Sequence, residues 1–327
     1  MKTTFKETQE GIKLVKDTFE KELAKALTLT RVTAPRFLVT GTGLQDDLAG
    51  TQDPVRFTAR GISRDVEIVH SLAKWKRHTL GRYDFRPYTG IYTDMDAIRK
   101  DEDISEIHSF YVDQWDWEVV IRAEDRTITY LKKTVEQIYR ALKKTQKKIM
   151  KKFPGLRKEL PKKIIFVHTE DLEKEYPLLS AKEREYAVTK KYGAVFLIGI
   201  GYPLASGKPH DLRASDYDDW STETSLGRGL DGDIIVWDDA RKQPLELSSM
   251  GIRVDAKALE LQHKRPYQEF HKAIRDGKLP LTIGGGIGQS RLCQLLLEKR
   301  HIGEVQCSVW SDKMKREATR QRIMLLE

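Results

Sequence analysis

The segment "TIGGGIGQSRLCQLLL" (282–297) restricts the fold of this chain more than any other stretch. Four of the five residues from Gly284 to Gly288 are glycines, and glycine lets another part of the protein or a ligand come close to the backbone. An apolar run with helical spacing follows. We therefore predict a strand and a glycine-rich turn that lead into a helix over residues 289–299.

The two common phosphate-binding motifs do not fit this segment. A P-loop requires Lys and Ser or Thr directly after its last glycine, but Gly288 is followed by Gln289, Ser290 and Arg291. A dinucleotide-binding fingerprint requires a third glycine where this chain has Gln289. Helix N-termini and arginine both favour phosphate. Two interpretations stay open: a phosphate site that uses Arg291, or a tightly packed turn with this arginine on the surface.

The remaining pattern predicts an α+β (mixed α/β) fold, with a mostly antiparallel sheet flanked by helices, because the early strands pair across polar turns instead of alternating with helices. Only residues 160–200 could form a parallel crossover. Pro35 lacks a backbone donor, so its strand is expected at a sheet edge or a subunit contact. Apolar spacing predicts helices at 4–27, 134–152, 181–191 and 258–275, and β-prone runs predict strands at 107–121, 163–168, 194–200, 233–237 and 245–249. Residues 66–80 are predicted as a strand that runs into a helix.

Composition narrows the class of protein. The chain has 327 residues, is 39% apolar and 33% charged, and contains no apolar run long enough to span a membrane. We expect one domain over residues 1–327. The N-terminal segment lacks the apolar core of a signal peptide, which favours the cytoplasm. Cys293 and Cys307 form no metal-ligand pattern, and no disulfide is expected.

The net charge of +9 is concentrated in the Lys-rich segment 143–163. A solvated helix face with its following loop would explain this segment. A nucleic-acid patch is the alternative, but Phe153 is the only aromatic residue available for base stacking.

Polar residues alternate along the predicted strand 107–121. Gln114, Asp116 and Glu118 share one face of it, and Trp115 and Trp117 lie on the other. Three neighbouring polar side chains are costly to bury without partners, so their face either lines a polar pocket or is exposed to solvent. Arg99 precedes the acidic loop before this strand, which predicts a strand–loop–strand unit.

A third cluster lies in residues 232–255. Asp233 and Glu246 fall on adjacent predicted strands, and a pair of carboxylates suits Mg²⁺, which also takes phosphate oxygens. Arg253 follows and could bind a carboxylate.

The three clusters resemble the signature motifs of class II aminoacyl-tRNA synthetase catalytic domains: "RVTAPRF" as a dimer-interface element, 99–118 as the ATP-holding arginine unit, and "GGGIGQSRLCQLLL" as the third motif. The chain is more similar still to the ammonia-dependent asparagine synthetase (aspartate–ammonia ligase) family. This resemblance covers nearly the whole chain and is weakest in the Lys-rich segment and after Trp310. The motifs that carry it are "HSLAKWKRHTLG", "YVDQWDWE", "SDYDDWST", "GDIIVW", "ELSSMGIRVD" and "TIGGGIGQSRL".

The resemblance implies a two-step reaction. L-Aspartate and ATP would give β-aspartyl-AMP and pyrophosphate, and ammonia would then convert the adenylate to asparagine and AMP. It also implies Mg²⁺, a homodimer, and no nucleic-acid or membrane partner.

The resemblance also implies the site residues. Arg99 would contact the α-phosphate and Arg291 the terminal phosphates. The wider ATP-binding set is completed by His108, Ser109, Glu246 and Gly288, with Asp233 and Glu246 as the metal ligands.

For the amino acid, Gln114 and Ser249 would position the adenylate, and Lys76 and Arg253 would hold the α-carboxylate. Three further acids would bind the α-amino group or the incoming ammonium, without a division of roles between them: Asp46, Asp116 and Asp218.

Two rival functions belong to other classes. A tRNA synthetase would need an anticodon-binding barrel, for which neither the residues before Pro35 nor those after Trp310 leave room. A non-catalytic regulator built on such a core would be expected to lack signature arginines or metal acids, whereas all are present. A glutamine-dependent synthetase would need an N-terminal cysteine, but position 2 is Lys2, so free ammonia is expected as the nitrogen source.

Overall fold

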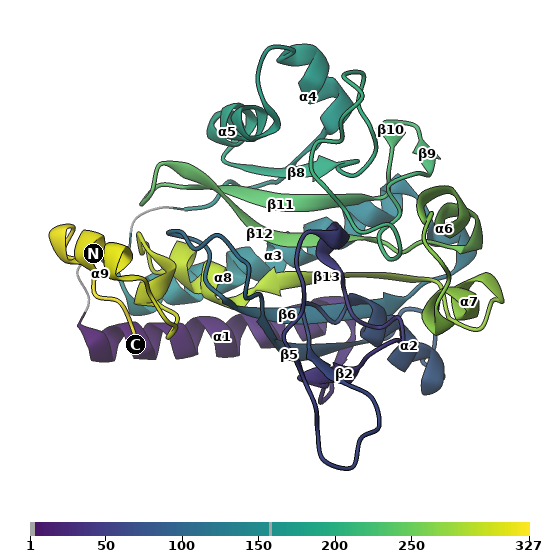
Figure 1. Ribbon diagram of the computed structural model, residues 1–327. Helices are drawn as coiled ribbons and strands as arrows, with labels where there is room; N and C mark the ends of the chain where they lie inside the picture. Colours follow the sequence, from purple (N-terminus) through teal and green to yellow (C-terminus); the bar gives the residue numbers. More distant parts are fainter. Residues whose placement is uncertain (1–3, 157–158) are drawn as a thin grey trace.

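A computed structural model describes residues 4–156 and 159–327 (Figure 1). Its centre is an eight-stranded sheet with the order β1-β5-β6-β13-β12-β11-β8-β7. The inner pairs are antiparallel, and the described parallel pairs lie at the edges, β1 with β5 and β7 with β8. This confirms the predicted mostly antiparallel α+β fold. The strands are β1 (Leu29–Arg31), β5 (Gly90–Ile98), β6 (Tyr111–Val120), β7 (Ile165–His168), β8 (Ala194–Ile198), β11 (Asp231–Asp238), β12 (Gln243–Ile252) and β13 (Thr282–Gly288).

One face of the sheet is covered by α1 (Phe5–Leu27), α3 (Ile128–Lys152) and α8 (Gln289–Leu296) (Figure 1). The main hydrophobic core lies between them and the sheet. Trp115 and Trp117 of β6 are fully buried there, and the ring of Phe19 from α1 lies 4.9 Å from that of Trp115. Alternation along β6 therefore places Gln114, Asp116 and Glu118 on the opposite face.

The glycine-rich segment is not a turn, which corrects the sequence prediction. Residues 282–288 form the central strand β13, paired with β6 on one side and β12 on the other. A Cβ atom at Gly284 would overlap the Glu118 carboxylate, and one at Gly286 would overlap the Gln114 amide. These glycines are thus required for close approach by neighbouring side chains, and not for a turn conformation.

The segment around Pro35 contains two short strands. β1 lies at the edge of the main sheet, whereas β2 (Phe37–Val39) belongs to a three-stranded sheet with β3 (Arg56–Phe57) and β4 (Val66–Ile68). Pro35 lies between β1 and β2 and in neither, so the single strand predicted through it is wrong. Helix α2 (Ala73–Arg82) follows β4. The strand–loop–strand prediction around Arg99 is confirmed by β5 and β6, although β6 begins at Tyr111 and not at residue 107.

Residues 160–200 form the predicted parallel crossover, with α4 (Thr169–Glu175) and α5 (Ala181–Tyr192) between β7 and β8. The helix predicted at 258–275 is wrong as one unit, because the segment 263–268, which contains Pro266, separates α6 (Ala256–Gln262) from α7 (Glu269–Arg275). Helix α9 (Asp312–Arg320) and helix α4 were not predicted. The short strands β9 (Glu223–Thr224) and β10 (Gly227–Arg228) form a separate hairpin.

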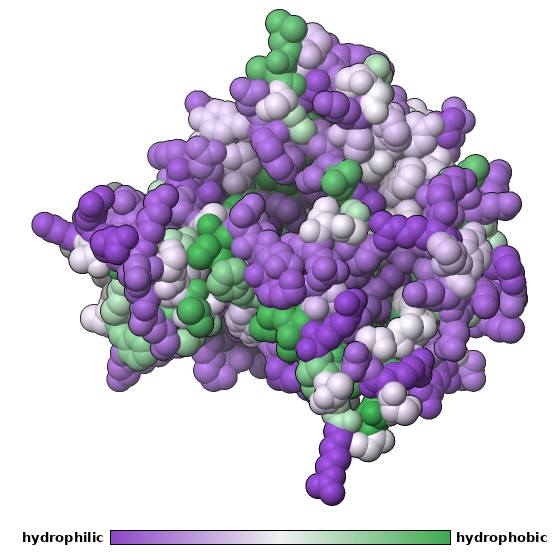
Figure 2. Space-filling model, viewed as in Figure 1, coloured by the Kyte–Doolittle hydropathy of each residue, from purple (hydrophilic) through white to green (hydrophobic). Residues whose placement is uncertain are grey.

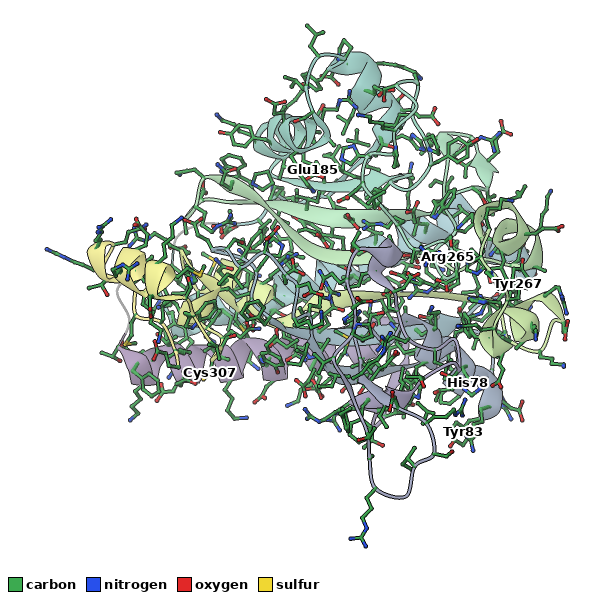
Figure 3. The ribbon with its side chains drawn as sticks, viewed as in Figure 1. His78, Tyr83, Glu185, Arg265, Tyr267 and Cys307 are labelled. Carbon is green, nitrogen blue, oxygen red and sulfur yellow. The ribbon has the colours of Figure 1, made fainter. Side chains whose placement is uncertain are left out.

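Three further features bear on the sequence predictions. No helix within the described residues is long and apolar enough to cross a membrane. Both cysteines are free, Cys293 buried and Cys307 exposed on the segment labelled in Figure 3. In the Lys-rich segment, Lys147, Lys148, Lys151 and Lys152 lie exposed on α3, and residues 157–158 lie outside the described part.

Two phenylalanines of α1 allow a matched test of this packing. Phe19 is fully buried against Trp115, whereas Phe5 is 57% exposed. Phe19→Ala should lower the free energy of unfolding by about 3–5 kcal/mol, because it leaves a cavity in the core. Phe5→Ala, the control on the same helix, should change it by less than about 0.5 kcal/mol. Denaturant titration of both variants measures this, and equal losses would contradict the described packing.

Candidate active site

A cavity of about 400 Å³ lies over the polar ends of β6, β12 and β13. Figure 2 shows this side of the molecule as largely hydrophilic and hollowed near its middle. Loops around Asp46, Arg99 and Arg213 complete the wall. Among the residues predicted for the site, all but Lys76 and Asp233 line this cavity: Asp46, Arg99, His108, Ser109, Gln114, Asp116, Asp218, Glu246, Ser249, Arg253, Gly288 and Arg291.

The polar face of β6 meets this cavity, which decides between the two interpretations of its pattern. Gln114 and Asp116 line the wall, and Glu118 is completely buried. Burial of Asp116 and Glu118 is tolerated because each has a cationic partner, Lys76 for the first and Arg253 for the second. The face is a pocket wall and not a solvated surface.

Lys76 of α2 lies behind Asp116 and is fully buried. Its ammonium group donates to the Asp116 carboxylate, to the Trp117 carbonyl at 2.9 Å and to the Gly285 carbonyl at 3.1 Å. Burial lowers the pKa of Lys76 and raises the pKa of Asp116. Because all three donors are engaged, the described Lys76 reaches the cavity only through Asp116.

Arg253 joins two further carboxylates at the same end of the cavity. It donates to both oxygens of Glu118 at 2.8–3.2 Å and also to Asp218. Burial disfavours the Glu118 carboxylate, but Arg253 and Lys76 hold its pKa below the ordinary value. Burial raises the pKa of Asp218 despite the pairing with Arg253. This end of the cavity is a compact network of paired charges.

Asp46 is held at the cavity by three donors. It accepts from the Leu48 amide at 2.9 Å, from Ser71 Oγ at 2.7 Å and from the Tyr217 hydroxyl at 3.2 Å. Ser71 and Tyr217 also line the cavity and were not predicted. Only their place inside quoted motifs, "HSLAKWKRHTLG" and "SDYDDWST", could have singled them out.

The other end of the cavity holds the two signature arginines. Arg99 donates to the His70 carbonyl at 3.3 Å, its buried Nε has no hydrogen-bond partner, and it forms no ion pair with a described residue. Arg291 donates to the Glu246 carbonyl at 3.0 Å and to the Ile107 carbonyl at 3.4 Å, and its guanidinium lies 3.5 Å from the Glu246 carboxylate. Two guanidinium groups with spare donors suit a polyphosphate.

The predicted metal acids lie on neighbouring strands. Asp233 is paired with Ser249 across β11 and β12, and Ile235 with Glu246. A β-bulge shifts this register, so Glu246 and Ser249 share one face although they are three residues apart. Glu246 lines the cavity, whereas Asp233 is bound by Arg213 and does not.

The acids nevertheless fit a cation. The Oδ1 atom of Asp233 is buried without a hydrogen-bond partner among the described residues. Burial and the nearby Glu246 raise the pKa of Asp233 to about 7, against the influence of Arg213. A divalent cation would offset this excess of negative charge. Arg213, which lines the cavity, was missed because its loop carries no recognised motif.

A second cluster brings together Asp216, His263 and His271, with ligand atoms within 4.8 Å of one another. Its cation position is already filled, because Lys74 Nζ lies 2.7 Å from Asp216 Oδ2. His271 Nε2 lies 2.9 Å from the same oxygen, and Nδ1 accepts from the Gln268 amide. The cluster therefore joins α2, α7 and the loop before Tyr217 through this ion pair and these hydrogen bonds.

Comparison with known proteins agrees with this geometry. A family model described as aspartate-ammonia ligase matches residues 6–322. The chain belongs to the aspartate–ammonia ligase family. An aspartate–ammonia ligase of Parabacteroides distasonis is 50% identical over 98% of this chain and 95% of its own length, and one of Bacillus mycoides is 50% identical over 98% of each.

Solved structures similar to this aspartate–ammonia ligase family member share its fold. An asparaginyl-tRNA synthetase of Pyrococcus horikoshii, complexed with asparaginyl-adenylate, has a TM-score of 0.67 at 14% identity, over 91% of this chain and 68% of that one. An aspartyl-tRNA synthetase of Entamoeba histolytica has a TM-score of 0.60 at 14% identity, over 91% and 58%. These likenesses confirm the predicted class II synthetase-like core.

His108 gives the site a testable pH dependence. Burial and the adjacent Arg291 lower its pKa to about 4, whereas a histidine in the unfolded chain has a pKa of about 6.5. The unfolded chain thus binds more protons between these values, and the free energy of unfolding should fall as the pH drops through this window. Denaturant titrations from pH about 7 to about 4 should show a shallower decline for His108→Gln. An NMR titration with a His108 midpoint near 6.5 would contradict the prediction.

Proposed function

We propose that this chain is an aspartate–ammonia ligase that makes L-asparagine from L-aspartate, ammonia and ATP. The observation that carries the proposal is that a single cavity joins Arg99 and Arg291 at one end to the paired charges around Arg253 at the other. One end suits a triphosphate and the other a small zwitterion. Membership of the aspartate–ammonia ligase family specifies the reaction.

In the first step, a β-carboxylate oxygen of aspartate attacks the α-phosphorus of ATP, and the bond to pyrophosphate breaks. Arg99 and Arg291 neutralise charge on the phosphates, and His108, Ser109 and Gly288 complete the nucleotide wall. The neutral His108 adds no charge of its own. Guanidinium groups held in place before the reaction contribute most where charge develops in the transition state.

At the other end, Arg253 and Lys76 are the cations assigned to the aspartate α-carboxylate, and in the described arrangement the Lys76 ammonium is bound to Asp116. Gln114 and Ser249 flank the position of the adenylate. Asp46, Asp116 and Asp218 supply negative charge for the α-amino group and for ammonium. Fixing both reactants next to each other removes much of the entropic barrier.

In the second step, the nitrogen lone pair of ammonia attacks the β-carbonyl carbon of the aspartyl adenylate. The bond from that carbon to the phosphate oxygen breaks, and AMP leaves. The acids around Asp116 lie at the end of the cavity where this attack occurs, so they are suited to hold ammonium and to receive its proton.

Asp233 and Glu246 would hold Mg²⁺, which neutralises phosphate charge when bound. The proposal also includes a homodimer formed through the edge containing β1 and Pro35. It further includes a single catalytic domain over residues 1–327 and a cytoplasmic location. The exposed lysines of α3 are assigned no nucleic-acid partner.

The defining experiment incubates the purified protein with ATP, Mg²⁺, aspartate and ammonium. We expect asparagine, AMP and pyrophosphate in equal amounts, and no asparagine when glutamine replaces ammonium. Formation of ADP, or charging of tRNA without asparagine release, would contradict the proposed reaction.

Lys76→Met tests the aspartate end of the cavity. Loss of the ammonium leaves Asp116 without its buried partner, so the KM for aspartate should rise by about tenfold or more, with the KM for ATP little changed. Lys74→Met is the matched control, because Lys74 lies on the same helix and pairs with Asp216 outside the cavity. Equal effects of both variants on the KM for aspartate would remove Lys76 from the substrate site.

A further inference from the structure

Helix α8, which carries Arg291, begins without a side-chain cap of its own. Its N-cap residue is Gly288, which has no side chain to accept from the first amide groups. Those amides need acceptors when a helix end is buried. Gly288 itself lines the cavity, so a larger capping residue there would occupy space proposed for the nucleotide.

Asp113 of β6 supplies the missing cap from another part of the chain. Its Oδ1 accepts from the Ser290 amide at 3.0 Å, and its Oδ2 accepts from the Ser290 hydroxyl at 2.8 Å. Gln306 Nε2 donates to Oδ1 at 3.3 Å, and Lys16 Nζ to Oδ2 at 3.1 Å. The Asp113 carboxylate thus joins the start of α8 to β6, to α1 and to the segment after α8.

This anchor is one residue away from Arg291. The direction of an arginine in the first turn depends on the rotation of the helix about its axis, and Asp113 fixes that rotation through two bonds to Ser290. Arg291 is then held at its contacts with Ile107 and Glu246. We propose that Asp113 is a positioning residue for adenylate formation, which acts by orienting Arg291 toward the phosphates of ATP.

Besides its hydrogen bond to Asp113, Lys16 offsets the negative charge of that residue. Asp113 lines the cavity, so its negative charge would repel a triphosphate if it were left uncompensated. Lys16 from α1 supplies the opposite charge. Removing Lys16 alone should therefore weaken ATP binding, and removing the charge of Asp113 as well should restore part of it.

The inference rests on the phosphate role given to Arg291 under the proposed function. The test measures aspartate-dependent exchange of pyrophosphate into ATP for Asp113→Ala, Asp113→Asn, Arg291→Ala and the double variant Asp113→Ala/Arg291→Ala. Asp17→Asn is the control, because Asp17 lies on α1 but contacts exposed Lys13. Thermal unfolding of each variant identifies any that fail to fold.

Asp113→Ala should lower kcat/KM for ATP by about tenfold while the KM for aspartate stays unchanged. Asp113→Asn, which keeps an acceptor for the Ser290 amide, should lose less. In the Arg291→Ala background, Asp113→Ala should cause no further loss, because its effect passes through Arg291. Losses that multiply, or a rise in the KM for aspartate equal to that for ATP, would overturn the positioning role.

Lys16→Met keeps the inference falsifiable if Asp113→Ala does not fold. Its KM for ATP should rise by about threefold to tenfold, and Asp113→Asn in the same chain should reverse part of that rise. Independent effects of the two substitutions would overturn the inference. Normal exchange in Arg291→Ala would instead show that the proposed phosphate role of Arg291 is wrong, and the inference would fall with it.

Discussion

The burial of charge over the glycine strand β13 is the constraint on which the site depends. Glu118 and Gln114 cross this strand at Gly284 and Gly286, where any side chain would displace them. Glu118 then reaches Arg253, which in turn reaches Asp218. A buried ion is costly unless its partner is held in good geometry. The glycines therefore allow a dense charged network to lie over the central strands of the sheet.

The two ends of the cavity differ in how far their charged side chains are paired with one another. At the aspartate end, cations and acids are paired with one another, so the α-ammonium and α-carboxylate of aspartate, which together carry no net charge, can exchange partners with them. At the nucleotide end, Arg99 has no ion pair among the described residues and Arg291 only a distant one with Glu246. Cations that are unpaired or only loosely paired leave more of their attraction available for the triphosphate. The sheet holds both ends in one register, since Gln114 and Glu246 come from strands on either side of β13.

The sequence allowed the class of fold and the polar wall to be predicted because strand alternation is periodic, as residues 114–118 illustrate. Prediction failed where the positions of side chains do not follow the regular alternation of a strand. Glu246 and Ser249 share a face only because a β-bulge lies between them. The glycine segment is a strand whose glycines leave room for the side chains of Gln114 and Glu118. Loop residues such as Arg213 and Tyr217 lie in the site through tertiary contacts without a local pattern. Lys76 was predicted to hold the substrate α-carboxylate, but its position behind Asp116 depends on three contacts that only the fold supplies.

Around the aspartate end of the cavity, an exposed ion pair lies at the periphery and a buried one lies closer to the centre. Arg265 and Tyr267, labelled in Figure 3, lie on the segment between α6 and α7, and Arg265 pairs with Asp47 beside Asp46. Both partners are largely exposed, so salt screens this pair, whereas the Lys74–Asp216 pair below it is buried and screened little. This exposed pair is thus a weak addition to the hydrogen bonds that hold Asp46, whereas the pair beneath it is a strong inner contact. Added salt should therefore weaken the outer pair while the buried charged floor keeps its geometry.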